Sequence, residues 1–306
     1  MNKRLAQVAI LLWSIILIVA IFVFVKVAIS DGTERKSFGF NFSLRNSQNG
    51  PFVVAKDITI DSKIKAVEID WISGDLSFYK SQDEKIRIIQ MAEEKFPQNE
   101  LFTYTVSKER LKLTDERKNT VQIGFFTSSN RSDLQIFLPE RLWESLELNT
   151  VSSDISFEHF NSEIVFINTI SGKIEVSGES PELFIKTVSG NVNIDEFLGN
   201  RIDLNTTSGN VVVKGSFKEL DINTISGRVK ATTSIPLTSL KSSSISGNVT
   251  IVMADNDGFT LDFSKVSGRL EADFPLTING SKYTYKNGDS KYIVSTVSGS
   301  FIIQIQ

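Results

Sequence analysis

The chain of 306 residues is long enough for one or two domains with a real core, and its hydrophobic content of 41% is ordinary for a globular protein. It contains no cysteine, which excludes disulfides, thiol chemistry and cysteine-ligated metals. The first 28 residues carry three basic and no acidic side chains, so residues 29–306 hold 30 basic against 36 acidic ones, a net charge of −6. A negative domain is not steered toward nucleic acid, which is therefore not an expected partner.

An uncharged run, "LAQVAILLWSIILIVAIFVFV", covers residues 5–25. As a helix it would be about 31 Å long, which matches the hydrocarbon core of a bilayer of about 30 Å. We predict a short tail over residues 1–4 and an uncleaved transmembrane anchor over residues 5–28. A cleavable signal peptide is the alternative, but signal apolar regions usually span about 7–15 residues, and "FVKVAISDG" is a poor cleavage site.

Basic residues flank this run on both sides, so the positive-inside rule does not settle its orientation. A very short N-terminal tail before a large domain is typical of a signal anchor. We therefore expect a single-pass protein of the cell membrane with an extracytoplasmic C-terminal domain. A membrane-tethered scaffold on the cytoplasmic face is the alternative.

After a juxtamembrane segment with the first strands (residues 29–58), residues 59–306 repeat one pattern around a Ser-Gly corner. From Ser153 the corners follow at steps of 19, 18, 19, 18, 20, 21 and 31 residues, which is typical of a repeat architecture. Apolar residues recur seven and five positions before each corner and two and four after it, and Ser242 is the clearly polar exception. The corners are Gly74, Ser153, Gly172, Gly190, Gly209, Gly227, Gly247, Gly268 and Gly299.

A spacing of two on both sides of a bend predicts two half-buried strands per repeat, and glycine suits the bend because it accepts a positive φ. Two all-β architectures satisfy this pattern. We favour a right-handed β-solenoid in which each period of about 19 residues forms one coil of a parallel stack. An antiparallel meander, with Ser-Gly as the hairpin loop, remains open because periodicity alone does not exclude it.

Residues 75–145 break the period and read as strands separated by polar turns, so we expect an antiparallel excursion that caps the stack. Residues 146–306 then form the stacked coils. The long last step contains an inserted hairpin, Thr277 to Tyr292, with turns at Asn279-Gly280 and Asn287-Gly288. We expect substitution at Gly209, in the stack, to cost more than substitution at Gly288, in the insertion.

The segments "LELNTVSSDISF", "TISGKIEV", "TVSGNVNI" and "TTSGNVVV" resemble the bacterial toast-rack, or "putative adhesin", domain of unknown function. With its N-terminal anchor, the chain is similar to the membrane-anchored members of Lia-type cell-envelope stress operons of Gram-positive bacteria. The resemblance implies an extracytoplasmic stacked-β domain with a role in envelope stress. It carries over no catalytic residue. Ser153, where the pattern has glycine, and the long last step depart from it.

Chemistry-bearing motifs are sparse. His159 is the single histidine, and its spacing of two from the inward Phe157 predicts that it points to the interior rather than to a catalytic site. The cluster Asp255, Asn256, Asp257 and Gly258 resembles a fragment of a calcium loop. The downstream acid of an EF-hand is missing, so it is a weak Ca²⁺ candidate at Asp255 and Asp257, and no cofactor is expected.

Paired carboxylates on the outside of the coils would suit a carbohydrate-active solenoid. The candidates are Glu175, Asp203 and Asp221, but other coils hold Asn193, Val212, Lys230 or Lys186 at the positions compared, so no acid cluster is predicted. The leading hypothesis is a non-enzymatic interaction or structural module of the cell envelope, with a protein or glycan partner. The alternatives are a surface carbohydrate-active enzyme, an adhesin, and the cytoplasmic scaffold.

Overall fold

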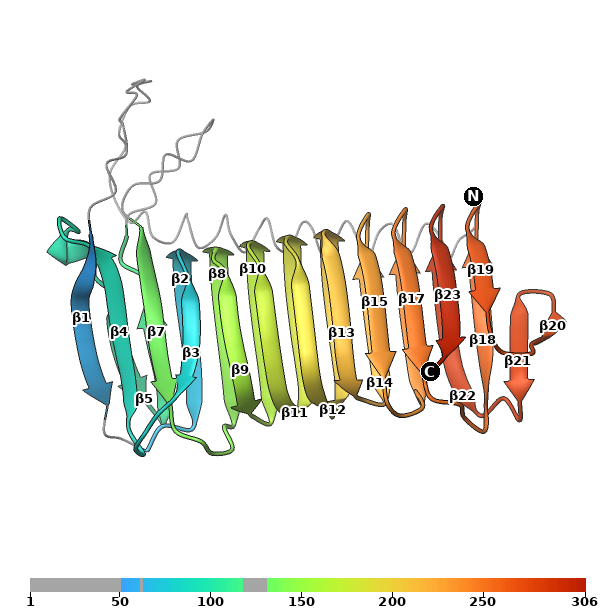
Figure 1. The fold of residues 1–306 in the computed structure, drawn as a ribbon, viewed down its shortest axis with the longest axis horizontal. Helices are drawn as coiled ribbons and strands as arrows, with labels where there is room; N and C mark the ends of the chain where they lie inside the picture. The colour runs from blue at the N-terminus through green and yellow to red at the C-terminus, as the bar shows by residue number, and fades with distance from the viewer. Residues whose placement is uncertain (1–50, 61–62, 118–130) are drawn as a thin grey trace, which may run out of the picture.

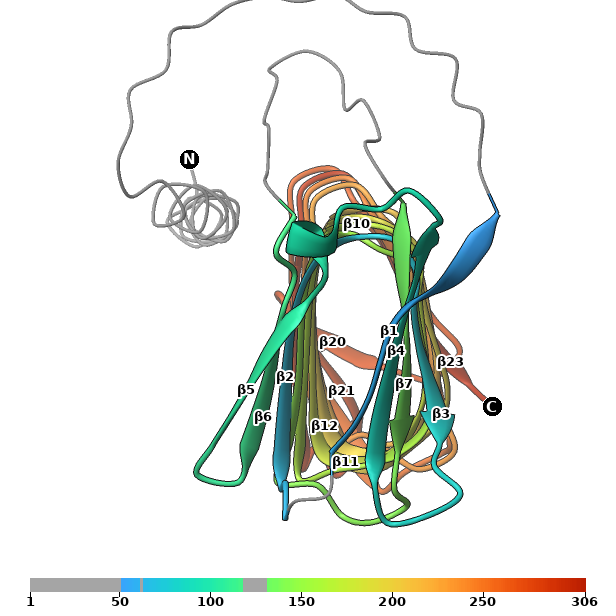
Figure 2. The same ribbon diagram turned by 90° about the vertical axis from the view of Figure 1, so that its left-hand side faces the viewer.

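The computed structural model describes residues 51–60, 63–117 and 131–306, and these form one elongated stack of β-strands (Figure 1). Two sets of strands face each other across an apolar interior, and we call them wall A and wall B (Figure 2). The predicted helix over residues 5–28 lies outside these ranges. Within them, no helix has the length and hydropathy needed to span a membrane.

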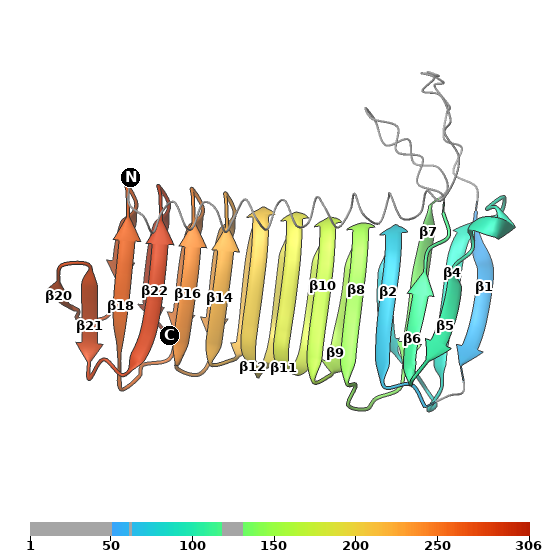
Figure 3. The same ribbon diagram turned by 180° about the vertical axis from the view of Figure 1, so that it is seen from behind.

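Wall A faces the viewer in Figure 3 and runs from one end of the stack to the other. The last parts of the two long bent strands β11 and β12 belong to it, between β10 and β14. In spatial order its strands are β5 (Thr103–Ser107), β6 (Arg110–Thr114), β2 (Ala66–Ser73), β8 (Ser145–Ser152), β10 (Ile164–Ser171), β11 (Ile174–Ser189), β12 (Val192–Ser208), β14 (Glu219–Thr224), β16 (Ser239–Ser244), β22 (Ser290–Thr296), β18 (Gly258–Lys265), β21 (Lys282–Lys286) and β20 (Thr277–Asn279).

Wall B faces the viewer in Figure 1 and contains the first parts of β11 and β12. A short 3-10 helix, η1 (Gln98–Glu100), lies between β4 and β5 in the chain. In spatial order the other strands of wall B are β1 (Phe52–Ile60), β4 (Ile86–Glu93), β7 (Ser132–Leu138), β3 (Leu76–Lys80), β9 (Ile155–Asn161), β13 (Asn210–Ser216), β15 (Arg228–Thr233), β17 (Asn248–Met253), β23 (Ser300–Ile305) and β19 (Arg269–Ala272).

The repeats stack as parallel coils. Leu183 of β11 lies opposite Val165 of β10 on one side and Ile202 of β12 on the other, so equivalent residues of successive coils are neighbours. A meander would require antiparallel neighbours, so the structure supports the solenoid-like stack for the repeat region. Its right-handed sense stays a prediction.

The apolar rows read from the sequence form the core. Of the 36 residues in these rows, all are buried except Leu270 and Ala272, and these two lie in the edge strand β19. Ser242 is also buried, at 2% exposure, between apolar neighbours of the adjacent coils. Burying one face of every strand supplies the main stabilisation of the stack, since each fully buried Val, Leu or Ile contributes roughly 1.5–3 kcal/mol.

The excursion over residues 75–145 is only partly antiparallel, which corrects the prediction. Within it, β4 pairs antiparallel with β1 and β7, and β5 pairs antiparallel with β6, but β6 and β7 pair in parallel with β2 and β3. The reason is that both strands continue the inner rows: Leu111 lies opposite Val67, and Leu134 lies opposite Leu76. β6 and β7 thus add one more rung to the walls, and the antiparallel strands lie outside it.

The last two coils are not stacked in chain order. The C-terminal strands β22 and β23 lie between the coil of β16 and β17 and the coil of β18 and β19. The predicted hairpin makes this possible: β20 and β21 pair antiparallel, and β21 adds to the free side of β18. The chain then returns past β18 and enters the stack on its other side.

The corner glycines are needed mainly because the coils approach closely. Gly74, Gly172 and Gly209 have positive φ, but the other five do not. All eight share another property: a Cβ would lie 1.9–2.5 Å from a backbone carbonyl oxygen of the neighbouring coil, far inside contact distance. Ser153, the exception, has no positive φ and is buried, with its hydroxyl unbonded within the described chain.

The alternation of 19- and 18-residue steps has a local cause. His159 and Glu196 both have left-handed backbones, with φ of 56° and 51°, and each marks an extra residue in wall B relative to the next coil. Both coils that contain them are 19 residues long, whereas the coils of Gly178 and Gly215 have 18. Each bulge shifts the strand register just before the chain turns back toward wall A, a turn that we call the second bend.

Candidate functional site

The bulge overturns the prediction for His159. Because the residue takes a left-handed conformation, the alternation set by Phe157 is broken, and Phe160 rather than His159 enters the core. His159 is exposed on the outer surface. Its backbone N–H donates to Ser177 Oγ at 3.3 Å. It therefore belongs to the surface of the second bend.

At the weak Ca²⁺ candidate, the carboxylate of Asp255 forms an ion pair with Lys286. Lys286 Nζ lies 3.0 and 2.9 Å from the two carboxylate oxygens of Asp255 and 2.7 Å from the carbonyl of Asn256. The hydrogen bonds from Lys286 and then from Tyr285 lower the pKa of Asp255. Asn256 Oδ1 accepts the N–H of Gly258 and closes the turn, and Asp257 is exposed. An ammonium thus fills the place of the cation, and these residues do not fit a Ca²⁺ site.

The three outer carboxylates separate into two places. Glu175 lies on wall B, where it forms an ion pair with Lys173 at 2.6 Å. Asp203 and Asp221 lie on wall A in direct register on neighbouring strands. The sequence comparison did not reveal this pair, because the residues it compared lie in different rows of the stack. Burial, and then the nearby charge of Asp203, raise the pKa of Asp221.

The Asp203–Asp221 pair belongs to a repeated amide ladder. Asn205 Nδ2 donates to Asp203 at 2.6 Å, and Asn223 Nδ2 donates to Asp221 at 3.2 Å. The ladder runs from coil to coil, with Asn223 Nδ2 bonded to Asn205 Oδ1 at 3.1 Å. Asn149 makes the same contact with Glu147, two residues before it, at 3.0 Å. A motif repeated in three coils is typical of a device that ties strands together rather than of a unique catalytic centre.

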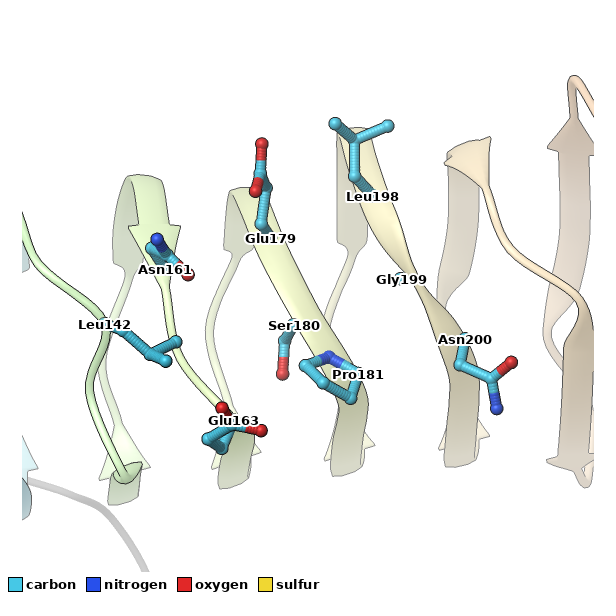
Figure 4. A pocket seen from close by; sticks show the side chains of 9 residues that line it. All are labelled: Leu142, Asn161, Glu163, Glu179, Ser180, Pro181, Leu198, Gly199 and Asn200. Carbon is cyan, nitrogen blue, oxygen red and sulfur yellow. The ribbon is translucent and has the colours of Figure 1, made fainter.

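A shallow apolar hollow lies at the second bend of the first coils (Figure 4). Its aliphatic side chains come from separate segments: Leu142 precedes β8, Pro181 lies within β11 and Leu198 within β12. Leu142 is 56% exposed and Leu198 is 50% exposed, and their common place at the hollow makes them an apolar patch rather than scattered single residues. The other residues that line it are Asn161, Glu163, Glu179, Ser180, Gly199 and Asn200.

Small residues at the turn create this hollow. Ser162 and Ser180 are buried, and their hydroxyls donate to the carbonyls of Ile164 and Glu182 at 2.9 and 2.8 Å. In the next coil Gly199 replaces them, and a Cβ there would lie 2.1 Å from the carbonyl oxygen of Ser180. The floor is therefore close-packed backbone, and the larger side chains project around it.

The surface around the hollow is acidic. Glu163 and Glu179 line the hollow, and Glu158, Glu182 and Glu196 lie within three residues of lining positions in the chain; all five are exposed and have no ion pair among the described residues. Lys218, whose backbone N–H donates to the carbonyl of Asn200 at 3.0 Å, is an exposed basic residue near the hollow, whereas two nearby arginines are engaged elsewhere. Arg201 pairs with Asp203 at 3.2 Å, and Arg141 donates to the carbonyl of Ile64 and lies over the ring of Trp143. We call these five glutamates and the apolar hollow together the acidic bend.

Comparison with known proteins identifies the fold family. The family model Toastrack DUF4097 matches residues 58–304, which is most of the chain. The chain belongs to the Toastrack DUF4097 family. No curated protein matches this Toastrack chain.

Solved structures match this Toastrack chain at low identity and with TM-scores below 0.5. A "putative lipid binding protein" from Parabacteroides distasonis is 14% identical with a TM-score of 0.47, and the match covers 84% of this chain and 98% of that one. A "putative adhesin" from the same species is 12% identical with a TM-score of 0.45, covering 84% and 98%. Another from Bacteroides fragilis is 13% identical with a TM-score of 0.40, covering 81% and 97%.

Sequence reasoning missed the acidic bend of this Toastrack chain. Its residues lie between the two strand motifs of each repeat, where spacing varies because of the bulges, so no regular pattern marks them. One signal was present in the sequence. In the coils that start at Ser153, Gly172 and Gly190, the residues after the strand that follows the corner are rich in glutamate. Later coils carry Lys214, Lys218 or Thr232 in the same segment.

Proposed function

We propose that this chain is a non-enzymatic interaction module, anchored in the cell membrane by residues 5–28 and exposed on the extracytoplasmic side, where it serves the response to cell-envelope stress. The observation that carries the interaction role is the acidic bend, an unpaired charged and apolar surface held on a stiff stack. The apolar run near the N-terminus supports the anchor. The resemblance to Lia-type proteins supports the stress response.

A carbohydrate-active enzyme is the second candidate, and the Asp203–Asp221 pair favours it. Glycoside cleavage uses two carboxylates, one of which acts as the acid, and here burial raises the pKa of Asp221 beside Asp203. The purified protein would then release sugar from envelope glycan, and Asp221→Asn would abolish the release. We place this second, because both carboxylates are held by the amide ladder that recurs at Asn149.

Topology is the first test of the proposed function. A C-terminal tag is followed by blot after protease is added to intact cells, or to protoplasts where a wall blocks access. Loss of the tag with cytosolic markers intact is the expected result. Digestion only after lysis would overturn the extracytoplasmic proposal and favour the scaffold on the cytoplasmic face. Inhibition of cell attachment by the purified protein would instead favour the adhesin.

A further inference from the structure

We infer that the acidic bend binds an extended peptide segment of a partner protein that carries both basic and aliphatic side chains. This rests on the proposed role of the chain as an interaction module and adds the chemistry of the partner. The structure contributes two independent features at one place: exposed leucines around a hollow and a surplus of unpaired carboxylates.

The apolar part of the argument is the exposure of large side chains. Leu142, Pro181 and Leu198 all line the hollow, and the two leucines each expose half or more of their surface. Neither leucine belongs to the inner rows, so packing of the stack does not explain them. Covering them with an aliphatic side chain removes apolar surface from water on both partners.

The electrostatic part decides which ligand class fits. Two glutamates line the hollow and three more lie within three residues of its lining in the chain, all without an ion pair among the described residues, so the local charge favours a cationic partner. The same charges repel anionic lipid headgroups and anionic polymers. The lining residues are aliphatic, amide, hydroxyl and carboxyl groups, so the hollow offers no aromatic ring face on which a sugar would stack.

The dimensions suit an extended chain. The hollow spans four neighbouring segments, from the residues before β8, through the turn between β9 and β10, to β11 and β12. At about 4.8 Å between neighbouring strands this is roughly 14 Å, the length of about four residues of an extended peptide. Side chains of such a peptide alternate between its two faces, so one face can present aliphatic groups to the hollow while the other faces water and the flanking glutamates.

The test uses the full chain in phosphatidylcholine nanodiscs, with empty nanodiscs as background. Three fluorescent ten-residue peptides are compared by anisotropy: alternating lysine and leucine, alternating glutamate and leucine, and alternating lysine and serine. Only the lysine–leucine peptide is expected to bind, and raising the salt concentration should weaken it. Equal binding of all three peptides would overturn the inference, as would binding of phosphatidylglycerol vesicles in place of the peptide.

Matched variants locate the site. Glu163→Gln combined with Glu179→Gln, and separately Leu198→Ser, should each weaken the lysine–leucine peptide at least fivefold. The controls are Glu271→Gln and Ile278→Ser, an exposed glutamate and an exposed isoleucine at the opposite end of the stack. Unchanged thermal midpoints show that all variants fold. Equal loss in the controls, or no loss in the site variants, would refute the assignment even if the topology test succeeds.

Discussion

Ser242 and Ser244 lie two residues apart in β16, and both side chains are buried. Their hydrogen bonding differs. Ser244 Oγ donates to Thr296 Oγ1 at 2.9 Å, within a row of threonine and serine hydroxyls along the inside of the corners. Ser242 Oγ lies in an apolar row between Ile222 and Val294 and has no partner among the described residues. One hydroxyl therefore stabilises the stack, and the other costs the free energy of its lost hydration.

Ser242→Ala should raise the free energy of unfolding by about 1 kcal/mol, because it removes a buried hydroxyl without a partner and leaves almost the same shape. Ser244→Ala should lower it by about 1 kcal/mol, because it removes a bonded one. Urea denaturation of the two variants measures both changes. A loss of stability for both substitutions would show that Ser242 is also bonded.

Asp221 and Asp57 should respond to pH in opposite directions. The pKa of Asp221 is raised by burial, so its ionisation destabilises the fold as pH rises through the ordinary value near 3.8 toward the raised one. The pKa of Asp57 is lowered by hydrogen bonds from Arg87, so its contribution is present above 3.8 and is lost as pH falls.

At pH 7, Asp221→Asn should therefore have a higher thermal midpoint than the natural chain, and Asp57→Asn a lower one. The Asp221 difference should vanish near pH 3, where this carboxyl is protonated in the folded and unfolded states. The Asp57 difference should shrink as pH falls below 3.8 and vanish only once pH is below the lowered pKa of the folded state. Melting curves recorded across this pH range provide the measurement. A lower midpoint for Asp221→Asn at pH 7 would mean that the ionised carboxylate is needed by the amide ladder.

At the scale of the coil, the corner glycine and the hairpin glycine meet different constraints. Gly209 has a φ of 122°, and a Cβ would lie 2.0 Å from the carbonyl oxygen of Gly190 in the adjacent coil. Gly288, proposed from the sequence as an insertion tip, is also crowded, since a Cβ would lie 2.9 Å from Thr260 Oγ1. Gly280, at the turn between β20 and β21, has a φ of 62° and open space around it.

Gly209→Val should cost about 3 kcal/mol or more, because backbone strain and a clash between coils add together. Gly280→Ala is the matched control and should cost about 1 kcal/mol, which is the strain of a positive φ alone. Thermal or urea denaturation distinguishes them. Equal midpoints would mean that the corners are not closely stacked.

The strand pattern could be predicted from the sequence because each coil repeats the same pairings, so the apolar rows recur at fixed distances from the corner. The bulges could not, because a left-handed Glu196 or His159 carries no sequence mark and its effect depends on the neighbouring coil. The same bulges hid the acidic bend. The pairing of Asp203 with Asp221 was missed because the register between coils has to be known before outer side chains can be compared.

For the whole molecule, the order of the last coils leads to a counterintuitive prediction. A chain that ends at Ala254 keeps the coils through β17, whereas a chain that ends at Asp289 also keeps β18 and β19 but lacks the strands on which they pack. The shorter chain should be fully resistant to limited proteolysis in residues 131–254. The longer chain should be cut between residues 258 and 289 while the same upstream region stays intact.

Mass spectrometry of the fragments identifies the cleavage sites. The region upstream of residue 254 should unfold at the same thermal midpoint in the shorter and the longer chain. Protection of residues 258–272 in the longer chain would contradict the prediction, because β18 and β19 would then be docking directly on β16 and β17.

The place of β22 and β23 inside the stack has a consequence for synthesis. Residues 290–306 are synthesised after β18 and β19, yet they occupy an internal position between two earlier coils. Growth of the stack can follow the chain as it emerges only as far as β17, and the coil of β18 and β19 must wait for β22 and β23. A chain that lacks β22 and β23 keeps an open strand edge and an undocked coil, which proteases can recognise. The coil of β18 and β19 therefore becomes protected only after β22 and β23 have entered the stack.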